Sequence, residues 1–332
     1  MVRLNGNGKA GARTRVVLLG GKELAVHCLE STLGMPDVEV VAVIPCAGDD
    51  PDQERWYPSL ARHARDLRLP VHRPRSVNDA AFHPVLEQLR PDILLSIFYD
   101  KILKPRVLAL PRVAAVNLHF GLLPFNRGSF PIPWAIIDGN DAGVTLHHMD
   151  PGVDTGDIVA QCAVPVAGHE TAREVYDRCT AAGRYLFEGY FPLVVEGRAP
   201  RRGQPAEGGT YYPPGYAFDR WVDWSQPAGT LSRFARALTF APYPGARSAF
   251  AAREFELRHP VWVADTDVRA PAGTLLGIDP RWATIATGDG ALRVRTLCID
   301  GVELSAQEAL RRLGCNQGDE LELRSWQTTV AA

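Results

Sequence analysis

The chain has 332 residues, 46% of them hydrophobic and 22% charged, which is enough for one large domain and a smaller one. Its formal net charge of −2 argues against a general binder of polyanions, and no apolar run approaches the roughly 18 residues of a membrane span. Six cysteines without a Cys-x-x-Cys pair suit reduced thiols in a cytoplasmic protein rather than a disulfide framework or a zinc site.

The first two thirds of the chain alternate short apolar runs with stretches of helical spacing. Residues 1–14 are rich in glycine and lack the apolar core of a signal peptide, so we expect a disordered lead-in there. Strands are predicted at residues 15–20, 38–44, 93–97 and 114–118, and helices at residues 23–33, 54–67 and 78–89, the last with Asn78 as N-cap. This alternation predicts an α/β fold with a doubly wound, mainly parallel sheet of Rossmann-like type, whose ligands gather at the carboxyl ends of the strands.

The composition of the sequence and the length of its predicted elements change after a helix predicted at residues 171–195. The Pro/Gly-rich stretch at residues 197–215 indicates a linker, and a short helix at residues 232–238 is followed by short strands. Gly288-Asp289-Gly290 and Asp300-Gly301 predict hairpin turns. We therefore predict a catalytic domain at residues 15–197, a linker at 198–220 and a smaller OB-like β-barrel domain at 221–332.

Polar side chains suited to catalysis concentrate between residues 116 and 159. Asn117 and His119 end a predicted strand two residues apart, so they share one face of it. An amide donor beside an imidazole is suited to stabilising an oxyanion. Asp154 follows another strand in a glycine-rich loop, from which its carboxylate can meet His119, favour the protonated ring and orient it. Taken singly, each of the three is more often structural than catalytic, and the prediction depends on their conjunction.

With their neighbours, these residues resemble the signature of the formyltetrahydrofolate-dependent formyltransferases. That family includes methionyl-tRNA formyltransferase, glycinamide ribonucleotide formyltransferase and the amino-sugar N-formyltransferases. The matching motifs are Asn117-Leu-His119, Leu122-Leu-Pro124, Arg127-Gly128, Gly143-Val-Thr145, Met149-Asp150 and Gly152-Val-Asp154-Thr-Gly-Asp157. The resemblance extends to residues 96–103, 223–227, 242–245 and 287–293, and so spans residues 15–324.

The resemblance implies transfer of the formyl group of 10-formyltetrahydrofolate to a primary amine, with Asn117, His119 and Asp154 as the catalytic trio. It places the pterin of the donor against Phe98, Ile102 and Leu103, under a loop that contains Met149, Asp150, Gly152 and Val153. Many relatives carry Pro-Ser after the histidine, where this chain has Phe120-Gly121. That departure concerns the acceptor side of the pocket, and so the substrate rather than the reaction.

The acceptor is open between methionyl-tRNA and a small amine. Residues 221–332 hold 12 arginines, no lysine and 13 acidic side chains, a net charge of −1 that makes a poor platform for tRNA. An amino-sugar nucleotide or an amino-acid derivative such as hydroxyornithine is therefore favoured. The candidate acceptor-binding residues are Gly20, Gly21, Lys22, Phe120 and Arg127. The Gly-Gly-Lys turn is suited to an anionic group, although an ordinary strand-to-helix turn explains it equally well.

Three other functions stay open: hydrolysis of formylfolate, transfer of the one-carbon unit into another chemistry, and folate binding without catalysis. The intact trio counts against the last. No metal is expected, because His147 and His148 are adjacent in a predicted strand and face opposite ways. The oligomeric state, including a homodimer, is open.

Overall fold

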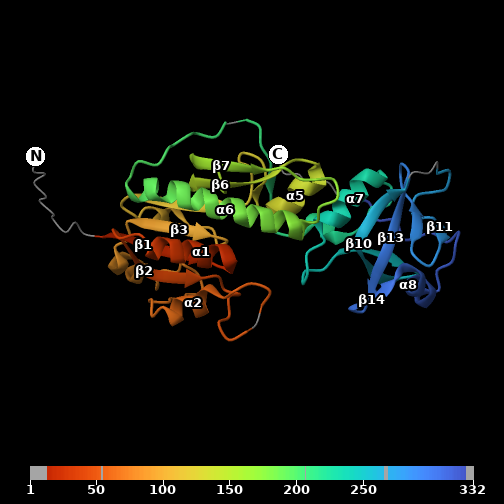
Figure 1. Ribbon diagram of the computed structural model, residues 1–332, viewed down its shortest axis with the longest axis horizontal. Helices are drawn as coiled ribbons and strands as arrows, with labels where there is room; N and C mark the ends of the chain where they lie inside the picture. The colour runs from red at the N-terminus through yellow and green to blue at the C-terminus, as the bar shows by residue number, and fades with distance from the viewer. Residues whose placement is uncertain (1–12, 54, 206, 265–267, 327–332) are drawn as a thin grey trace, which may run out of the picture. The chain divides into compact units, whose positions relative to one another are not determined.

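The computed structural model describes residues 13–53, 55–205, 207–264 and 268–326 (Figure 1). The lead-in predicted at residues 1–14 lies almost wholly outside the described residues. The chain divides into two compact units, each assembled from separate segments. Unit 1 consists of Met1–Pro124, Val144–Cys162 and Thr180–Glu207, and unit 2 of Phe125–Gly143, Ala163–Cys179 and Gly208–Ala332.

Unit 1 is built on a sheet with the strand order β2-β1-β3-β4-β6-β7. The strands are β1 Thr14–Gly20, β2 Val38–Pro45, β3 Ile93–Ile97, β4 Ala114–His119, β6 Ala142–His148 and β7 Ile158–Val164. The first four pair in parallel, which confirms the predicted sheet, whereas β6 runs antiparallel to β4. β3 and most of β1 are buried apolar runs, as expected of parallel strands covered on both faces.

Helices accompany this sheet: α1 Lys22–Leu33, α2 Leu60–Asp66, α3 His83–Leu89, α4 Pro105–Leu108 and the part of the long α6 Ala172–Val195 that begins at Thr180. Figure 1 shows α1 and α6 on the same side of the sheet. They meet where α6 has a glycine, because a Cβ built on Gly183 would lie 3.0 Å from Cδ2 of Leu24. Val17, Leu19 and Ile44 belong to a buried cluster within the same unit, formed by side chains of the strands and helices.

Two predicted helices begin later than expected. The helix predicted at residues 54–67 is confined to α2, because Pro58 disfavours helix before it and the Ser59 hydroxyl caps the first turn by accepting from Arg62 N at 3.0 Å. The helix predicted at residues 78–89 is confined to α3, which has Pro84 in its first turn and Phe82 at its N-cap. Asn78 is therefore not a cap.

Unit 2 contains an antiparallel sheet in the order β11-β12-β13-β10-β9, with β14 paired to β13. Its strands are β9 Ala246–Phe250, β10 Arg253–Ala264, β11 Leu275–Ile278, β12 Ala283–Ala286, β13 Ala291–Ile299 and β14 Val302–Ser305. Its helices are α5 Pro131–Asp138, η1 Ala217–Arg220, α7 Ala228–Ala237 and α8 Ala306–Leu313. Both predicted hairpins are present, and Asp300 and Gly301 have the left-handed φ values, 51° and 78°, of a tight hairpin turn.

The short helix predicted at residues 232–238 begins earlier, at Ala228, directly after Pro227, and α8 was not predicted. The predicted linker, residues 198–220, has paired backbone at two places. Arg202 forms an antiparallel bridge with Ile158, and β8 Tyr211–Tyr212 pairs in parallel with β5 Arg127–Gly128. The domain limits themselves stay a prediction.

Candidate functional site

The three residues of the predicted trio lie together in unit 1. Asn117 and His119 are on β4, and both reach the carboxylate of Asp154 in the loop between β6 and β7. Asn117 Nδ2 lies 3.4 Å from Asp154 Oδ1, and His119 Nδ1 lies 3.7 Å from Asp154 Oδ2. His119 is 8% exposed, so this imidazole and carboxylate face each other in a largely dehydrated setting where their attraction is strong.

A fourth side chain, His147, completes the cluster and was not predicted to belong to it. It is the cross-strand partner of Asn117 on β6, and its Nε2 lies 3.2 Å from Asn117 Nδ2 and 3.4 Å from Asp154 Oδ1. Its Nδ1 donates to the carbonyl of His148 at 2.8 Å, which leaves Nε2 to face the amide and the carboxylate. Alternation along the strand carried a signal for this position, because His147 and Thr145 share the face that is paired with Asn117 and His119.

The loop that carries Asp154 is held from within. Asp150 Oδ1 accepts from Gly152 N at 3.1 Å and from the Thr155 hydroxyl at 2.6 Å. A Cβ on Gly156 would lie 2.0 Å from the carbonyl oxygen of His148, so glycine is required for this close approach. Asp150 and Gly152, predicted to touch folate, therefore have a structural task in the loop, and their contact with a ligand stays a prediction.

Among the non-glycine residues with left-handed backbone conformations, Lys22 follows β1, Phe98 follows β3 and Asp154 lies in the loop between β6 and β7. The φ angles are 65° at Lys22, 55° at Phe98 and 53° at Asp154. Such conformations cost free energy for residues with a Cβ and cluster at functional sites. Each of these residues was predicted to bind or act on a ligand.

Lys22 lies over an aromatic side chain beside the carboxyl ends of β1 and β3. Its Nζ is 4.5 Å from the centre of the Phe98 ring and 5.8 Å from that of Trp56, distances at which a cation is attracted to the ring face. Burial lowers the pKa of Lys22, and the neighbouring Cys46 thiol opposes that shift. The backbone approaches closely here, because a Cβ on Gly20 would lie 2.0 Å from the carbonyl oxygen of Ile97.

The residues predicted to hold the pterin differ in exposure. Leu103 is buried, and Met149 packs against the same cluster, whereas the side chain of Ile102 is 63% exposed. Asn78 fixes the backbone on both sides of Leu103, since its side-chain amide donates to the carbonyl of Ile102 at 2.8 Å and accepts from Lys104 N at 2.9 Å. An exposed apolar side chain on a fixed backbone forms a surface suited to a flat ring. Folate binding by these residues stays a prediction.

The segment after His119 is also fixed by side chains. Phe120 is buried and meets Phe98 edge-on, with ring centres 4.6 Å apart. Thr145 Oγ1 donates to the carbonyl of Gly121 at 2.6 Å, and Gln161 Nε2 donates to that of Leu123 at 2.6 Å. Phe120 therefore packs in the core between the ends of β3 and β4. Its contact with the acceptor stays a prediction.

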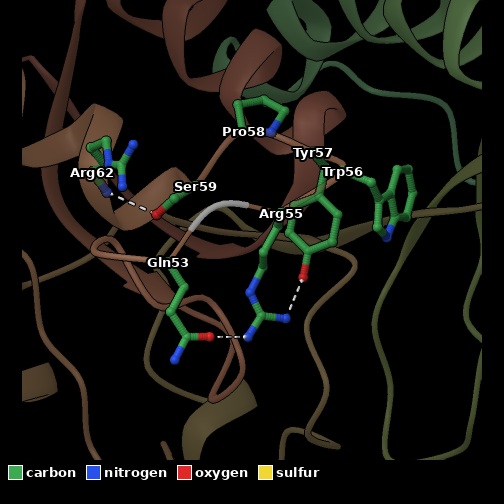
Figure 2. Close-up of a pocket in the computed structure, with 7 residues that line it drawn as sticks. All are labelled: Gln53, Arg55, Trp56, Tyr57, Pro58, Ser59 and Arg62. Atoms are coloured by element: carbon green, nitrogen blue, oxygen red, sulfur yellow. Dashed lines mark hydrogen bonds between the residues drawn. The ribbon is translucent and has the colours of Figure 1, made fainter. Parts of the chain in front are cut away.

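A cavity of about 360 Å³, open to solvent, is formed in unit 1 by the segment that joins β2 to α2 and by the start of α2 (Figure 2). Its lining consists of Gln53, Arg55, Trp56, Tyr57, Pro58, Ser59 and Arg62. In Figure 2 the Arg55 guanidinium lies between the Gln53 amide and the Tyr57 hydroxyl, to which it donates at 3.5 and 3.3 Å. Trp56 links this cavity to Lys22 and so to the strand ends. Sequence reasoning missed the cavity because no periodic or motif signal marks its residues.

The contact of Arg127 with the acceptor stays a prediction. Arg127 is on β5 in unit 2, where its backbone N–H donates to Thr210 at 3.0 Å. Among the described residues, no group of three or more His, Cys, Asp and Glu side chains could hold a metal ion. Within the same ranges, no helix has both the length and the apolar character to cross a bilayer.

An amide and an imidazole on β4, with the carboxylate of Asp154 beside them, are groups that can stabilise charge developing at a carbonyl carbon. The chain matches the model of the formyl transferase family over residues 14–188 and that of the formyl transferase C-terminal domain over residues 217–314. It is 31% identical, over 301 residues, to the methionyl-tRNA formyltransferase of Pelotomaculum thermopropionicum, an alignment that covers 90% of this chain and 95% of that protein. The chain therefore belongs to the formyl transferase family, whose members are enzymes.

Solved structures share the fold. An N-formyltransferase from Helicobacter canadensis, in complex with folinic acid and dTDP-3-aminofucose, superposes with a TM-score of 0.69 at 21% identity over 85% of this chain and 98% of that one. The sugar 3N-formyltransferase WlaRD, with dTDP and 5-N-formyl-THF, has a TM-score of 0.69 at 20% identity, covering 86% and 98% of the two chains. HypX from Aquifex aeolicus with tetrahydrofolic acid has a TM-score of 0.57 at 20% identity, covering 94% of this chain and 51% of HypX.

Proposed function

We propose that the protein transfers the formyl group of 10-formyltetrahydrofolate to the primary amine of a small molecule, either an amino-sugar nucleotide or an amino-acid derivative such as hydroxyornithine. The observation that carries this proposal is the convergence of Asn117, His119 and Asp154 within hydrogen-bond or ion-pair distance at the end of β4. Folate derivatives in the related structures support the class of donor.

In the proposed reaction the neutral amine attacks the formyl carbon, and the carbonyl oxygen acquires negative charge. With Nδ1 of His119 facing Asp154, its Nε2 is left to donate to that oxygen, together with the amide of Asn117. A well-placed donor of this kind contributes about 3–4 kcal/mol to the transition state. The carbon–N10 bond then breaks, the acceptor nitrogen loses a proton and N10 gains one. Asp154 holds His119 protonated and assists that proton movement, directly or through water.

The acceptor side of the site is assigned to the turn Gly20-Gly21-Lys22 and the neighbouring cavity. Lys22, Arg55 and Arg62 provide positive charge, and Trp56 and Tyr57 provide aromatic faces, a combination suited to an anionic group beside a flat ring. This combination favours a nucleotide-linked amine over a free amino acid.

Methionyl-tRNA is the second candidate acceptor, favoured by the 31% identical relative from Pelotomaculum. The charge of the C-terminal segment argues against it. Residues 221–332 carry 12 arginines and 13 acidic side chains, so this segment offers no excess of positive charge to replace the counterions of a polynucleotide.

The test is the rate of tetrahydrofolate release from 10-formyltetrahydrofolate, alone and with amino-sugar nucleotides, hydroxyornithine or charged initiator tRNA. Strong stimulation by a small amine, lost in His119→Ala, is the expected result. Stimulation by tRNA alone would establish the second candidate. Release that no acceptor changes would indicate a hydrolase, and folate binding without release would indicate a binding protein.

A further inference from the structure

The segment that follows α6 forms one bridge with the first residue of β7, the edge strand of the catalytic sheet. Residues 201–204, here called the strap, were predicted to lie in a linker. Within unit 1, Arg202 N donates to the carbonyl of Ile158 at 3.0 Å, and Ile158 N donates back to the carbonyl of Arg202 at 2.8 Å. Ile158 is the first residue of β7, directly after the loop that carries Asp154. The strap is therefore attached where this loop rejoins the sheet.

The first residue of the strap binds both ends of the loop. Arg201 Nε donates to Asp157 Oδ2 at 3.0 Å, and another guanidinium nitrogen of Arg201 donates to His148 Nδ1 at 3.1 Å. His148 ends β6 and precedes the loop, whereas Asp157 closes it. Because a guanidinium has no lone pair to accept a proton, this contact requires His148 Nδ1 to be unprotonated.

The last residue of the strap holds the backbone of Asp154 itself. Gln204 Nε2 donates to the carbonyl of Asp154 and to that of Gly156, both at 2.8 Å. Two carbonyl acceptors require a group with two N–H donors, which the glutamine amide supplies. Both bonds span the left-handed residue and its neighbours, so they oppose relaxation of Asp154 toward an ordinary backbone conformation.

We propose that Gln204 is a positioning residue for formyl transfer, one that fixes the Asp154 backbone so that its carboxylate stays between His119 and His147. This inference rests on the proposed function. The carboxylate faces His119 through Oδ2 at 3.7 Å and His147 through Oδ1 at 3.4 Å, so the position of the Asp154 backbone sets both distances. A shift of the backbone by a fraction of an ångström would change both contacts together.

The deciding variants are Gln204→Met, which keeps the side-chain length and removes both donors, and Gln204→Ala. Arg198→Ala is the matched control, because Arg198 is exposed and precedes the strap in the same segment after α6. We expect kcat to fall about 10- to 100-fold in both Gln204 variants, with KM for formyltetrahydrofolate changed less than about threefold. Arg198→Ala should retain the wild-type kcat.

A second measurement does not depend on turnover. The imidazole NMR signals of His119 and His147, assigned with single His→Gln variants, should shift in Gln204→Met and stay in place in Arg198→Ala. Wild-type kcat together with unmoved signals in Gln204→Met would overturn the inference while leaving the proposed function intact. If the wild-type protein itself shows no formyl transfer, the proposed function fails, and the NMR comparison alone decides whether Gln204 positions Asp154.

Discussion

The carboxylate of Asp154 faces His147 as well as His119, with 3.4 Å between Asp154 Oδ1 and His147 Nε2. His147 also lies 3.2 Å from the amide of Asn117 and is anchored by its own Nδ1 to the carbonyl of His148 at 2.8 Å. One imidazole nitrogen thus lies within 3.4 Å of two members of the trio. His147 is on β6, the strand antiparallel to β4, directly opposite Asn117.

Replacing His147 with alanine should lower kcat about tenfold, because losing one hydrogen-bond partner of the partly buried Asn117 amide corresponds to about 1–1.5 kcal/mol. KM for formyltetrahydrofolate should change little, since His147 acts through Asn117 and Asp154. Steady-state kinetics with the acceptor that stimulates release would measure both. A rise in KM at constant kcat would assign His147 to donor binding instead.

Replacing Asp154 with asparagine should depress kcat at least about 100-fold, because the amide cannot hold His119 protonated or assist proton movement. Dissociation constants for folate, measured by calorimetry, should stay within about threefold of wild type. Asp177→Asn, an exposed position on α6 paired with Arg173, provides the control. Weakened folate binding with unchanged turnover would refute the role assigned to Asp154.

Replacing Trp56 with alanine should raise KM for the acceptor about tenfold, since an aromatic face that stacks on a ligand contributes on the order of 1 kcal/mol. Folate affinity should remain unchanged. Tyr185→Ala removes an exposed aromatic side chain on α6, which is 76% exposed, and serves as the control. Equal acceptor kinetics in both variants would place the acceptor away from the cavity of Figure 2.

Gly156→Ala should destabilise the protein by roughly 2 kcal/mol and reduce turnover, because the new Cβ meets the carbonyl oxygen of His148 at 2.0 Å. Gly168→Ala is the matched control, since, among the described residues and apart from its two chain neighbours, no atom lies within 4 Å of a Cβ built there. Chemical denaturation of both variants measures the difference. Equal free energies of unfolding would show that the loop accommodates a side chain at Gly156.

Acidification should destabilise the fold through His148. Burial lowers the pKa of His148 in the folded chain, and the Arg201 guanidinium lowers it further. The unfolded state therefore binds more protons than the folded state. His148 makes its full contribution to the free energy of unfolding above its ordinary pKa near 6.5, and this contribution falls as the pH drops below that value. Urea unfolding from pH 7.5 to 5.5 should show a shallower fall in His148→Gln, by up to about 1.4 kcal/mol per pH unit. An unchanged slope would contradict the assignment.

Local patterns predicted the parallel sheet and the trio because both leave regular signals. Alternation put Asn117 and His119 on one face, and the glycine-rich loop marked Asp154. The cluster around them was harder to predict. Gln204 reaches Asp154 across 50 positions of sequence through backbone carbonyls, which no side-chain motif records. Trp56 lies in a stretch that was predicted to be helical. Because Pro58 disfavours helix before it, this stretch is a loop, and the loop lines the cavity.

The left-handed backbone conformations of Lys22, Phe98 and Asp154 limit the substitutions that can be used to stabilise the protein. Each is a position where glycine or asparagine would relieve strain, so selection for thermal stability alone would favour those replacements. The same replacements would remove the charge, the aromatic face or the carboxylate on which turnover is proposed to depend. Libraries designed for a hardier catalyst should therefore hold these three codons constant and seek stability in unit 2.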